Sequence, residues 1–364
     1  MNFDLMAELS PALFSDNYTE AREKFLAAAP GSKAYRCSGS GPAGEPLNVD
    51  AAYFGEPDAR NLLVIVSATH GDEGYCGSAG QLLFLKSGFH RDLPGSTAVL
   101  FVHALNAYGF AWDRRVTAEG CDLNRNFIDF SVPPPANLGY EELAEHIVPA
   151  DISPEAVRRA DLAIEEYGDA HGLYNLRVAR GSGQYTRPGG ASYGGEGPTE
   201  ARLTLERIVA DFDVMSRQKV VIIDYHTGLG PYGYGELQCE QPSGLAGYDR
   251  ARAIYGPSAT SPEVGNSSAV SLNGTQDEYW ERILGDRHTY VALEFGTYES
   301  ALGWRVMRED LWLFKYHPEL ADAELGRKIR AASKQYSYPQ KADWMEMVLG
   351  RSHLVHRQAL AAFR

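Results

Sequence analysis

Residues 61–74 read NLLVIVSATHGDEG, a short apolar run that ends in a cluster of polar residues. The run from Asn61 to Ala68 is continuous and partly β-branched, which is typical of a strand buried on both faces of a parallel or mixed sheet. His70 and Glu73 follow at its carboxyl end, where open α/β sheets collect their ligands. This stretch therefore predicts a central strand with a functional site beside it.

Three more apolar runs have the same character, and helical patterns alternate with them. The runs are 98–104, 219–225 and 288–295, and the helical patterns are 18–29, 77–86, 154 to about 167, 199–212 and 342–361. This alternation predicts an α/β fold with a mixed, mostly parallel twisted sheet flanked by helices on both faces. We expect a single catalytic domain over residues 1–364, with an insertion at about 130–198 that carries one helix and a long glycine-rich loop.

The composition of the chain limits the classes of molecule that it can bind. The chain has 364 residues, 44% of them hydrophobic, and a formal net charge of −14. An acidic surface argues against nucleic acid and anionic membranes as partners. No apolar stretch reaches the roughly 18 residues of a membrane span, and Met1–Pro11 lacks the pattern of an export signal. We therefore expect a cytoplasmic protein, in which oligomerisation is possible.

The four cysteines are far apart and form no CxxC pair, which predicts reduced thiols in such a compartment. Cys76 and Cys121 lie inside or beside the polar motifs. We expect both to be small buried residues rather than nucleophiles or metal ligands.

Two histidines and a glutamate offer a ligand set for one metal ion. Catalytic zinc takes three protein ligands from His, Glu or Asp and leaves one position open. The three-residue spacing of His70 and Glu73 in a tight turn brings both side chains to the same side, with Gly71 and Gly74 expected to permit the bend. His226, just beyond the run at 219–225, completes a His-Glu-His set.

Carboxylates near these motifs are suited to proton transfer and to orienting the ligand histidines. Glu294 ends an otherwise apolar run, where a carboxylate is either a costly buried charge or a functional group. It is our candidate general base. Asp122 and Asp224 are candidates to accept the second ring N–H of a ligand histidine.

Arginines concentrate positive charge beside the same motifs. Arg114, Arg115 and Arg125 stand close to an apolar run in a chain with excess acid. Because a guanidinium pairs with a carboxylate in bidentate geometry, this pattern favours a substrate that bears a free carboxylate.

Together these motifs resemble the zinc carboxypeptidase superfamily, which includes succinylglutamate desuccinylase and aspartoacylase. An HxxE pair, a downstream Asn-Arg pair, a later histidine and a glutamate occur in that family order. Residues 115–127 (RVTAEGCDLNRNF) are similar to the bacterial carboxypeptidase and murein-peptide amidase pattern RxNxxGVDLNRNF, and depart from it at Thr117 and Cys121. The chain most resembles an uncharacterised bacterial branch known as a domain of unknown function, which shares HTGLG (226–230), EFGTY (294–298) and the arginine pair.

The resemblance implies a zinc-carboxypeptidase-like fold and a role for each matching residue. His70, Glu73 and His226 would bind one zinc ion. Glu294 would be the general base and proton shuttle, and Arg115 would polarise the scissile carbonyl. Asn124 and Arg125 would hold the carboxylate of a small molecule or short peptide. The carboxypeptidases also use a tyrosine before the glutamate, for which Tyr279 and Tyr290 both remain open.

Other functions stay in competition with a carboxypeptidase-type activity. An N-acyl amino acid deacylase of the aspartoacylase or desuccinylase type needs the same residues. Residues 190–194 (GASYG) match the GxSxG pattern of a serine hydrolase around Ser192, with Asp277 and His288 following in the required order. A non-catalytic metal-binding module is the remaining alternative, which the presence of Glu294 disfavours.

Overall fold

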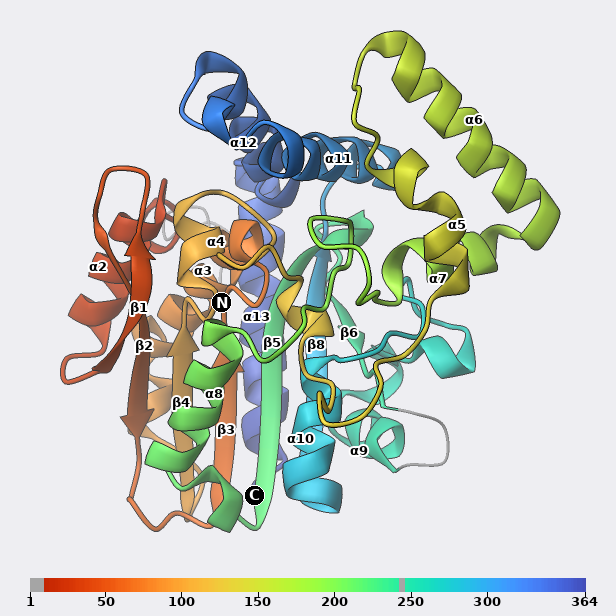
Figure 1. Cartoon of the computed structure of the whole chain (residues 1–364). Helices are drawn as coiled ribbons and strands as arrows, with labels where there is room; N and C mark the ends of the chain where they lie inside the picture. The colour runs from red at the N-terminus through yellow and green to blue at the C-terminus, as the bar shows by residue number, and fades with distance from the viewer. Residues whose placement is uncertain (1–9, 242–245) are drawn as a thin grey trace.

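A computed structural model describes residues 10–241 and 246–364, and these form an eight-stranded sheet covered by helices (Figure 1). Residues 1–9, which belong to the stretch predicted to lack an export signal, lie outside the described residues. The strands are β1 (Lys33–Ser40), β2 (Pro46–Phe54), β3 (Asn61–Val66), β4 (Thr97–His103), β5 (Lys219–Tyr232), β6 (Glu236–Gln238), β7 (Ala259–Thr260) and β8 (His288–Gly296). Their order across the sheet is β1-β2-β4-β3-β5-β8-β6-β7.

The helices follow in chain order. They are α2 (Tyr18–Ala28), α3 (Gly74–Lys86), α4 (Ala107–Ala111), α5 (Leu138–Ile147), α6 (Pro154–His171), α7 (Leu173–Gly181), α8 (Glu200–Asp211), α9 (Gly247–Tyr255), α10 (Gln276–Leu284), α11 (Ser300–Tyr316), α12 (Glu324–Ser337) and α13 (Ala342–Ala361). The five helical patterns of the sequence correspond to α2, α3, α6, α8 and α13. The four apolar runs correspond to β3, β4, β5 and β8.

The centre of the sheet is parallel and its edges are mixed. β3 pairs in parallel with β4 and β5, and β5 pairs in parallel with β8. β1, β2 and β6 pair antiparallel with their neighbours towards the sheet centre. The predicted mixed, mostly parallel sheet is thus confirmed at its centre, and the antiparallel pairs lie at the edges.

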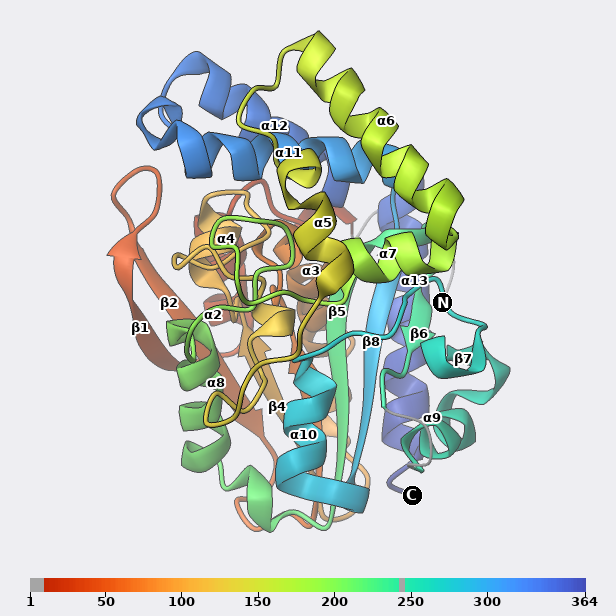
Figure 2. The same ribbon diagram turned by 45° about the vertical axis from the view of Figure 1, so that its right-hand side comes forward.

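Each central strand buries both faces, as the continuous apolar runs predicted. In β3, Leu63 and Ile65 pack with α2, α3, α9 and α13, whereas Leu62, Val64 and Val66 pack with α8 and α10. Alternate side chains of a strand point to opposite faces, so one run supplies both core layers. The two views in Figures 1 and 2 show these helices on either side of the sheet.

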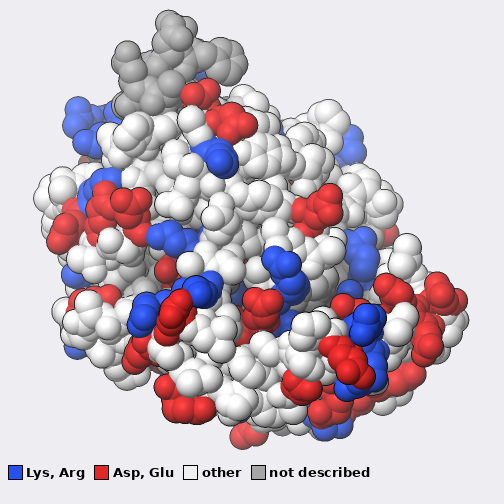
Figure 3. All heavy atoms as spheres, turned by 90° about the horizontal axis from the view of Figure 1, so that it is seen from above, with Lys and Arg blue, Asp and Glu red and all other residues white. Residues whose placement is uncertain are grey.

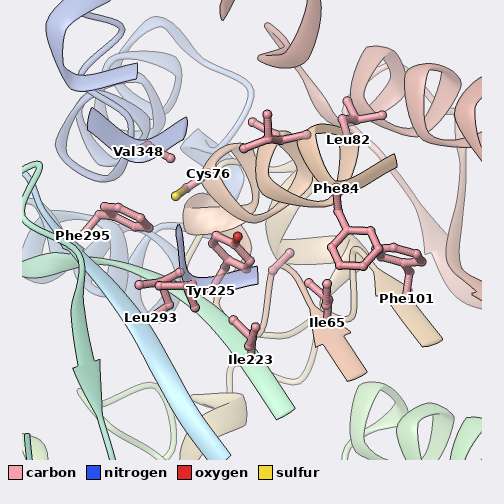
Figure 4. Close-up of a cluster of buried hydrophobic side chains, with 14 of the residues drawn as sticks. Ile65, Cys76, Leu82, Phe84, Phe101, Ile223, Tyr225, Leu293, Phe295 and Val348 are labelled. Atoms are coloured by element: carbon pink, nitrogen blue, oxygen red, sulfur yellow. The ribbon is translucent and has the colours of Figure 1, made fainter. Parts of the chain in front are cut away.

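Cys76 is a core residue, in agreement with the expectation for it. Figure 4 shows its side chain among Tyr225, Phe295 and Val348 in the first of these core layers. It is 1% exposed, and burial raises the pKa of its thiol well above the usual value. Burial likewise raises the pKa of Cys121 to about 12. Neither thiol is activated as a nucleophile.

The predicted insertion contains more regular structure than the sequence indicated. Residues 130–198 form three helices, α5, α6 and α7, before the glycine-rich loop begins, so the expectation of one helix was wrong. The three helices bury Leu143, Ile164 and Leu176 against α11 and α12 in a third core cluster. In both ribbon views these five helices gather at one end of the sheet.

Figure 3 looks onto this end of the molecule, where acidic and basic side chains are interspersed among uncharged ones. Within residues 10–241 and 246–364, no helix is both long and apolar enough to cross a bilayer.

Candidate metal centre

His70 and Glu73, which follow β3, converge on one point with His226 of β5. One potential ligand atom from each lies within 4.8 Å of the others, and all three residues are buried. Nδ1 of His70 lies 3.0 Å from Glu73 Oε1, and Nδ1 of His226 lies 3.0 Å from Glu73 Oε2. Two imidazole nitrogens and a carboxylate are a zinc-type donor set, so these residues fit a metal ion.

The turn after β3 brings His70 and Glu73 together. Ala68 adopts a left-handed φ of 59°, which turns the chain into the short 3₁₀ helix η1 (Gly71–Glu73). Gly71 and Gly74 have no left-handed φ, so the expected reason for their presence was wrong. Instead, a Cβ on Gly71 would stand 2.0 Å from the backbone of Gly109, and one on Gly74 would stand 2.7 Å from the Phe110 ring. Both glycines permit close packing against α4.

Asp224 contacts the ring of His226. His226 Nε2 lies 2.9 Å from Asp224 Oδ2, which places the other ring nitrogen, Nδ1, towards Glu73. Asp224 is completely buried and also accepts hydrogen bonds from Thr69 Oγ1, Gln276 Nε2 and Tyr290 Oη. These contacts hold the carboxylate in place, and they orient the ring through it.

His226 itself lies inside β5 rather than beyond it, because that strand continues to Tyr232. It is the direct neighbour of Glu294 across the parallel pair of β5 and β8. The third candidate ligand and the candidate base are therefore placed by sheet register.

Asp122 supports His70 in the same way. His70 Nε2 lies 3.0 Å from Asp122 Oδ1 and 2.9 Å from Arg115 Nη2. A guanidinium can only donate, so the two contacts cannot both be hydrogen bonds. The carboxylate contact requires the proton on Nε2 and leaves Nδ1 available to a metal. Arg115 donates from Nη1 to Glu73 Oε1 at 2.9 Å and from Nε to Asp122 Oδ2 at 3.2 Å.

The protonation of the free site follows from these contacts. Burial lowers the pKa of His226, yet the charge of Asp224 and the hydrogen bonds with Asp224 and Glu73 raise it well above the usual value. The pKa of His70 is also raised on balance, by Glu73 and Asp122 against burial and Arg115. Burial raises the pKa of Glu73, but both histidines hold it below its usual range. Without a metal, the two histidines are therefore more basic, and Glu73 is more acidic, than the same side chains in water.

Glu294 is a buried carboxyl group at the end of β8, 7% exposed, with Oε1 accepting the backbone N–H of Leu229 at 2.8 Å. Burial, followed by the negative charge of Glu73, raises its pKa to about 8, against the opposing effect of His226. A carboxyl group with a raised pKa at a metal-site candidate has the properties of a general acid–base.

The three arginines separate into two environments. Arg115 and Arg125 line the cavity above the triad. Arg114 does not: it forms a bidentate ion pair with Asp310 of α11, with both side chains about 95% buried, and lies over the ring of Phe314. The expectation that Arg114 adds charge beside the metal was wrong, because its charge is neutralised by an acidic residue on α11.

Asn124 and Arg125 lie on the 3₁₀ helix η3 (Leu123–Arg125) and face the same cavity. Asn124 Oδ1 accepts the backbone N–H of Gln276 at 2.8 Å. Arg125 is held by two backbone carbonyls, donating to Gly181 at 2.8 Å and to Asn124 at 2.7 Å. The amide and the guanidinium are thereby oriented beside the triad.

The cavity has a volume of about 720 Å³, within the range of small-molecule sites. Its walls come from the triad, from η3, from α7, from α11 and α12, and from residues 268–270 and 272. The segment 130–198, which contains α7, thus forms part of the cavity wall.

Neither tyrosine suggested by the sequence lines this cavity. Tyr290 is buried on Asp224, and Tyr279 is packed in the core against Phe127 and Trp280. Tyr336 of α12 does line it, and its hydroxyl donates to the carbonyl of Gly228 at 2.9 Å. Burial and the charges of Glu294 and Glu73 raise its pKa to about 12.

Sequence reasoning missed Tyr336 because it follows Glu294 in the chain rather than preceding it. It also missed Asp72, which accepts hydrogen bonds from Ser333 and Ser337 of α12. No local pattern marks either residue.

The GxSxG pattern does not have the geometry of a nucleophile elbow. Ser192 lies in the loop after α7, and its Oγ donates to the carbonyl of Arg180 at 3.1 Å. His288 contacts Asp277 at 3.1 Å, but its other ring nitrogen lies 2.7 Å from the Gly285 carbonyl. No described residue couples this histidine to Ser192, so the serine-hydrolase alternative loses its support.

Solved structures similar to this chain include thrombin activatable fibrinolysis inhibitor, with 12% identity, a TM-score of 0.44, and coverage of 88% of this chain and 73% of the other. The murein-tripeptide amidase MpaA from Escherichia coli O157 shares 18% identity at a TM-score of 0.33, covering 80% and 92%. The succinylglutamate desuccinylase from Chromobacterium violaceum shares 14% at 0.37, covering 90% and 76%. Likenesses this distant bear on neither the activity nor the substrate of this chain.

No curated protein matches the sequence. One family model, described as a protein of unknown function (DUF2817), matches residues 14–351, which is nearly the whole chain and includes every residue of the candidate site. This agrees with the resemblance drawn from the HTGLG and EFGTY motifs. The chain belongs to the DUF2817 family.

Proposed function

We propose that this chain is a metal-dependent hydrolase, with zinc as the metal, that cleaves an amide bond next to a free carboxylate. The observation that carries the proposal is the convergence of His70, Glu73 and His226 on one point, with Glu294 in the neighbouring register position on the same cavity. Three protein ligands with an open coordination position, next to an acid–base group, are typical of a catalytic rather than a structural metal centre.

Each residue then has a chemical task. His70, Glu73 and His226 would hold the ion, which supplies Lewis acidity when bound. Glu294 accepts a proton from the attacking water and delivers it to the leaving nitrogen. Arg115 stabilises the negative charge that develops on the carbonyl oxygen, and Asn124 with Arg125 binds the substrate carboxylate.

The test combines metal analysis with a hydrolysis screen. Protein loaded with zinc is assayed against peptides and N-acyl amino acids, because deacylation needs the same residues as peptide cleavage. We expect about one zinc ion per chain, lost in His226→Ala and kept in the control His171→Ala, whose histidine is exposed on α6. A wild-type protein that stays free of metal during zinc titration would contradict the proposal.

Glu294→Gln tests the proton-transfer role. It keeps the shape of the side chain but removes the base, so we expect kcat to fall by about 10²- to 10⁴-fold with zinc content unchanged. Glu299→Gln, the same change at an exposed position five residues on, is the matched control and should keep full activity. Activity of Glu294→Gln at the wild-type level would remove Glu294 from the mechanism.

A further inference from the structure

The cavity beside the metal centre contains two charged groups without an ion-pair partner among the described residues, and the proposed chemistry uses only one of them. Arg125 lies on one wall, and Glu240, which follows β6, lies on another. No described residue forms an ion pair with either within 4.0 Å, whereas Arg115 and Arg114 are both paired. Such unpaired charges at a cavity wall need an explanation, because burying them costs free energy.

Arg125 is oriented but not neutralised. Its Nε and Nη1 donate to the carbonyls of Gly181 and Asn124, which are uncharged acceptors. Its Nη2 has no hydrogen-bond partner among the described residues. An arginine held in this way presents part of its fork to a ligand carboxylate.

Glu240 is fixed through its backbone, which leaves the side chain free. Its N–H donates to Asp277 Oδ2 at 3.2 Å, and Asp277 Oδ1 in turn contacts His288 at 3.1 Å. The carboxyl oxygen Oε2 is shielded from solvent and has no hydrogen-bond partner in the part of the chain that the structure describes. Burial raises the pKa of Glu240 to about 7, with Asp277 adding to the effect and Arg125 opposing it.

The surroundings of Glu240 explain which ligand group would suit it. The charges that act on Glu240 are those of Arg125 and His226, which lower its pKa, and of Asp277 and Asp224, which raise it, but no described cation forms an ion pair with it. Ala269, Val270 and Leu272 line the same cavity and offer apolar surface to an aliphatic chain. An aliphatic chain that ends in an ammonium group buries its methylenes and keeps its charge paired.

We propose that the cavity selects amide substrates whose carboxylate-bearing part also carries a side-chain ammonium group, with the carboxylate on Arg125 and the ammonium on Glu240. The inference rests on the proposed function for the reaction, but the selectivity itself is a property of the cavity. A lysine-like residue at the carboxylate end of the amide is the simplest such substrate.

Turnover tests the selectivity with paired substrates. The substrates are acyl dipeptides that end in lysine or in norleucine, each in L and D form. Within one configuration, the two substrates differ only in the side-chain ammonium group. Because a hydrogen bond to a charged partner contributes more than a neutral one, we expect kcat/KM to favour lysine about 10- to 100-fold. Glu240→Gln should bring this ratio close to one, and Glu240→Lys should invert the preference towards acidic side chains. Asp249→Asn, the same loss of charge at an exposed site on α9, should keep the wild-type ratio.

Binding separates this inference from the proposed function. Calorimetry with free lysine and free norleucine needs no catalysis, and lysine should bind about 10-fold more tightly to the wild type but not to Glu240→Gln. Selective binding without hydrolysis of any amide would reject the proposed function and keep the selectivity. Hydrolysis of lysine and norleucine substrates with equal kcat/KM would keep the proposed function and reject the selectivity. Absence of any lysine preference in both binding and turnover overturns the assignment of Glu240.

Discussion

At the scale of single residues, the candidate ligands depend on carboxylates behind them. Asp122 and Asp224 each contact the ring nitrogen of a histidine that faces away from Glu73. This arrangement fixes which nitrogen of each ring is free for a metal. The spacing of Asp224 and His226 in the sequence made their contact predictable, whereas the contact of Asp122 with His70 and those of Thr69, Gln276 and Tyr290 with Asp224 join segments that are distant in the chain.

Asp122→Asn tests this dependence. An amide cannot hold the His70 proton in the same way, so we expect zinc affinity to fall by about 10- to 100-fold. Competition with a chromogenic chelator measures the change. The control is Asp169→Asn on the exposed face of α6, which should leave affinity unaltered. Equal zinc affinities in the wild type and both variants would show that Asp122 does not contribute to metal binding.

The raised pKa values of His70 and His226 predict proton release. The pKa of each imidazole is raised when no metal is bound, and a metal binds only the neutral ring. Zinc binding should therefore release protons from these rings, and the apparent affinity should rise with pH until the rings are neutral without the metal. Calorimetry in buffers of different ionisation enthalpy counts the protons. Binding heats independent of the buffer would contradict these protonation states.

At the scale of elements, α11 is attached to the site by one buried ion pair. Arg114 directly precedes Arg115, and its guanidinium donates hydrogen bonds to the carboxylate of Asp310 on α11. Helices α5, α6 and α7 in turn pack on α11, so this pair connects the wall of the cavity to the segment that carries Arg115. The sequence could not distinguish the two arginines, because Asp310 lies 196 positions away.

Arg114→Met should destabilise the protein by about 3–5 kcal/mol, because it leaves the carboxylate of Asp310 buried without a partner. Urea unfolding measures the loss. The double variant Arg114→Met with Asp310→Leu removes both charges and should recover much of the stability. A single variant as stable as the wild type would mean that Asp310 finds another partner or water.

At the scale of the whole molecule, the metal would join parts of the chain that are far apart. His70 and Glu73 follow β3, whereas His226 lies more than 150 residues later in β5. These strands are direct neighbours in the sheet, so register alone brings the ligands together. A bound ion adds a crosslink between them in the native state only.

Zinc should therefore stabilise the fold by mass action. At free zinc near 1,000 times the dissociation constant, the gain in unfolding free energy is about 4 kcal/mol. Urea unfolding with zinc and with a chelator measures it. The difference should vanish in His226→Ala and persist in His171→Ala. If the unfolding free energy of the wild type were the same with zinc and with the chelator, the site would not bind zinc in the native state.

The sequence by itself determined the four central strands, five of the helices and the polar motifs at the strand ends that supply the triad, because each of these features is local. A continuous apolar run buries both faces of a strand, and polar residues at its end meet at one edge of the sheet. It could not determine the number of helices in 130–198, whose apolar faces have meaning only against α11 and α12. Nor could it show that Arg114 is paired, that Tyr336 faces the cavity or that the Glu240 carboxylate has no ion-pair partner among the described residues. Those facts depend on contacts between residues tens to hundreds of positions apart, which only the tertiary structure decides.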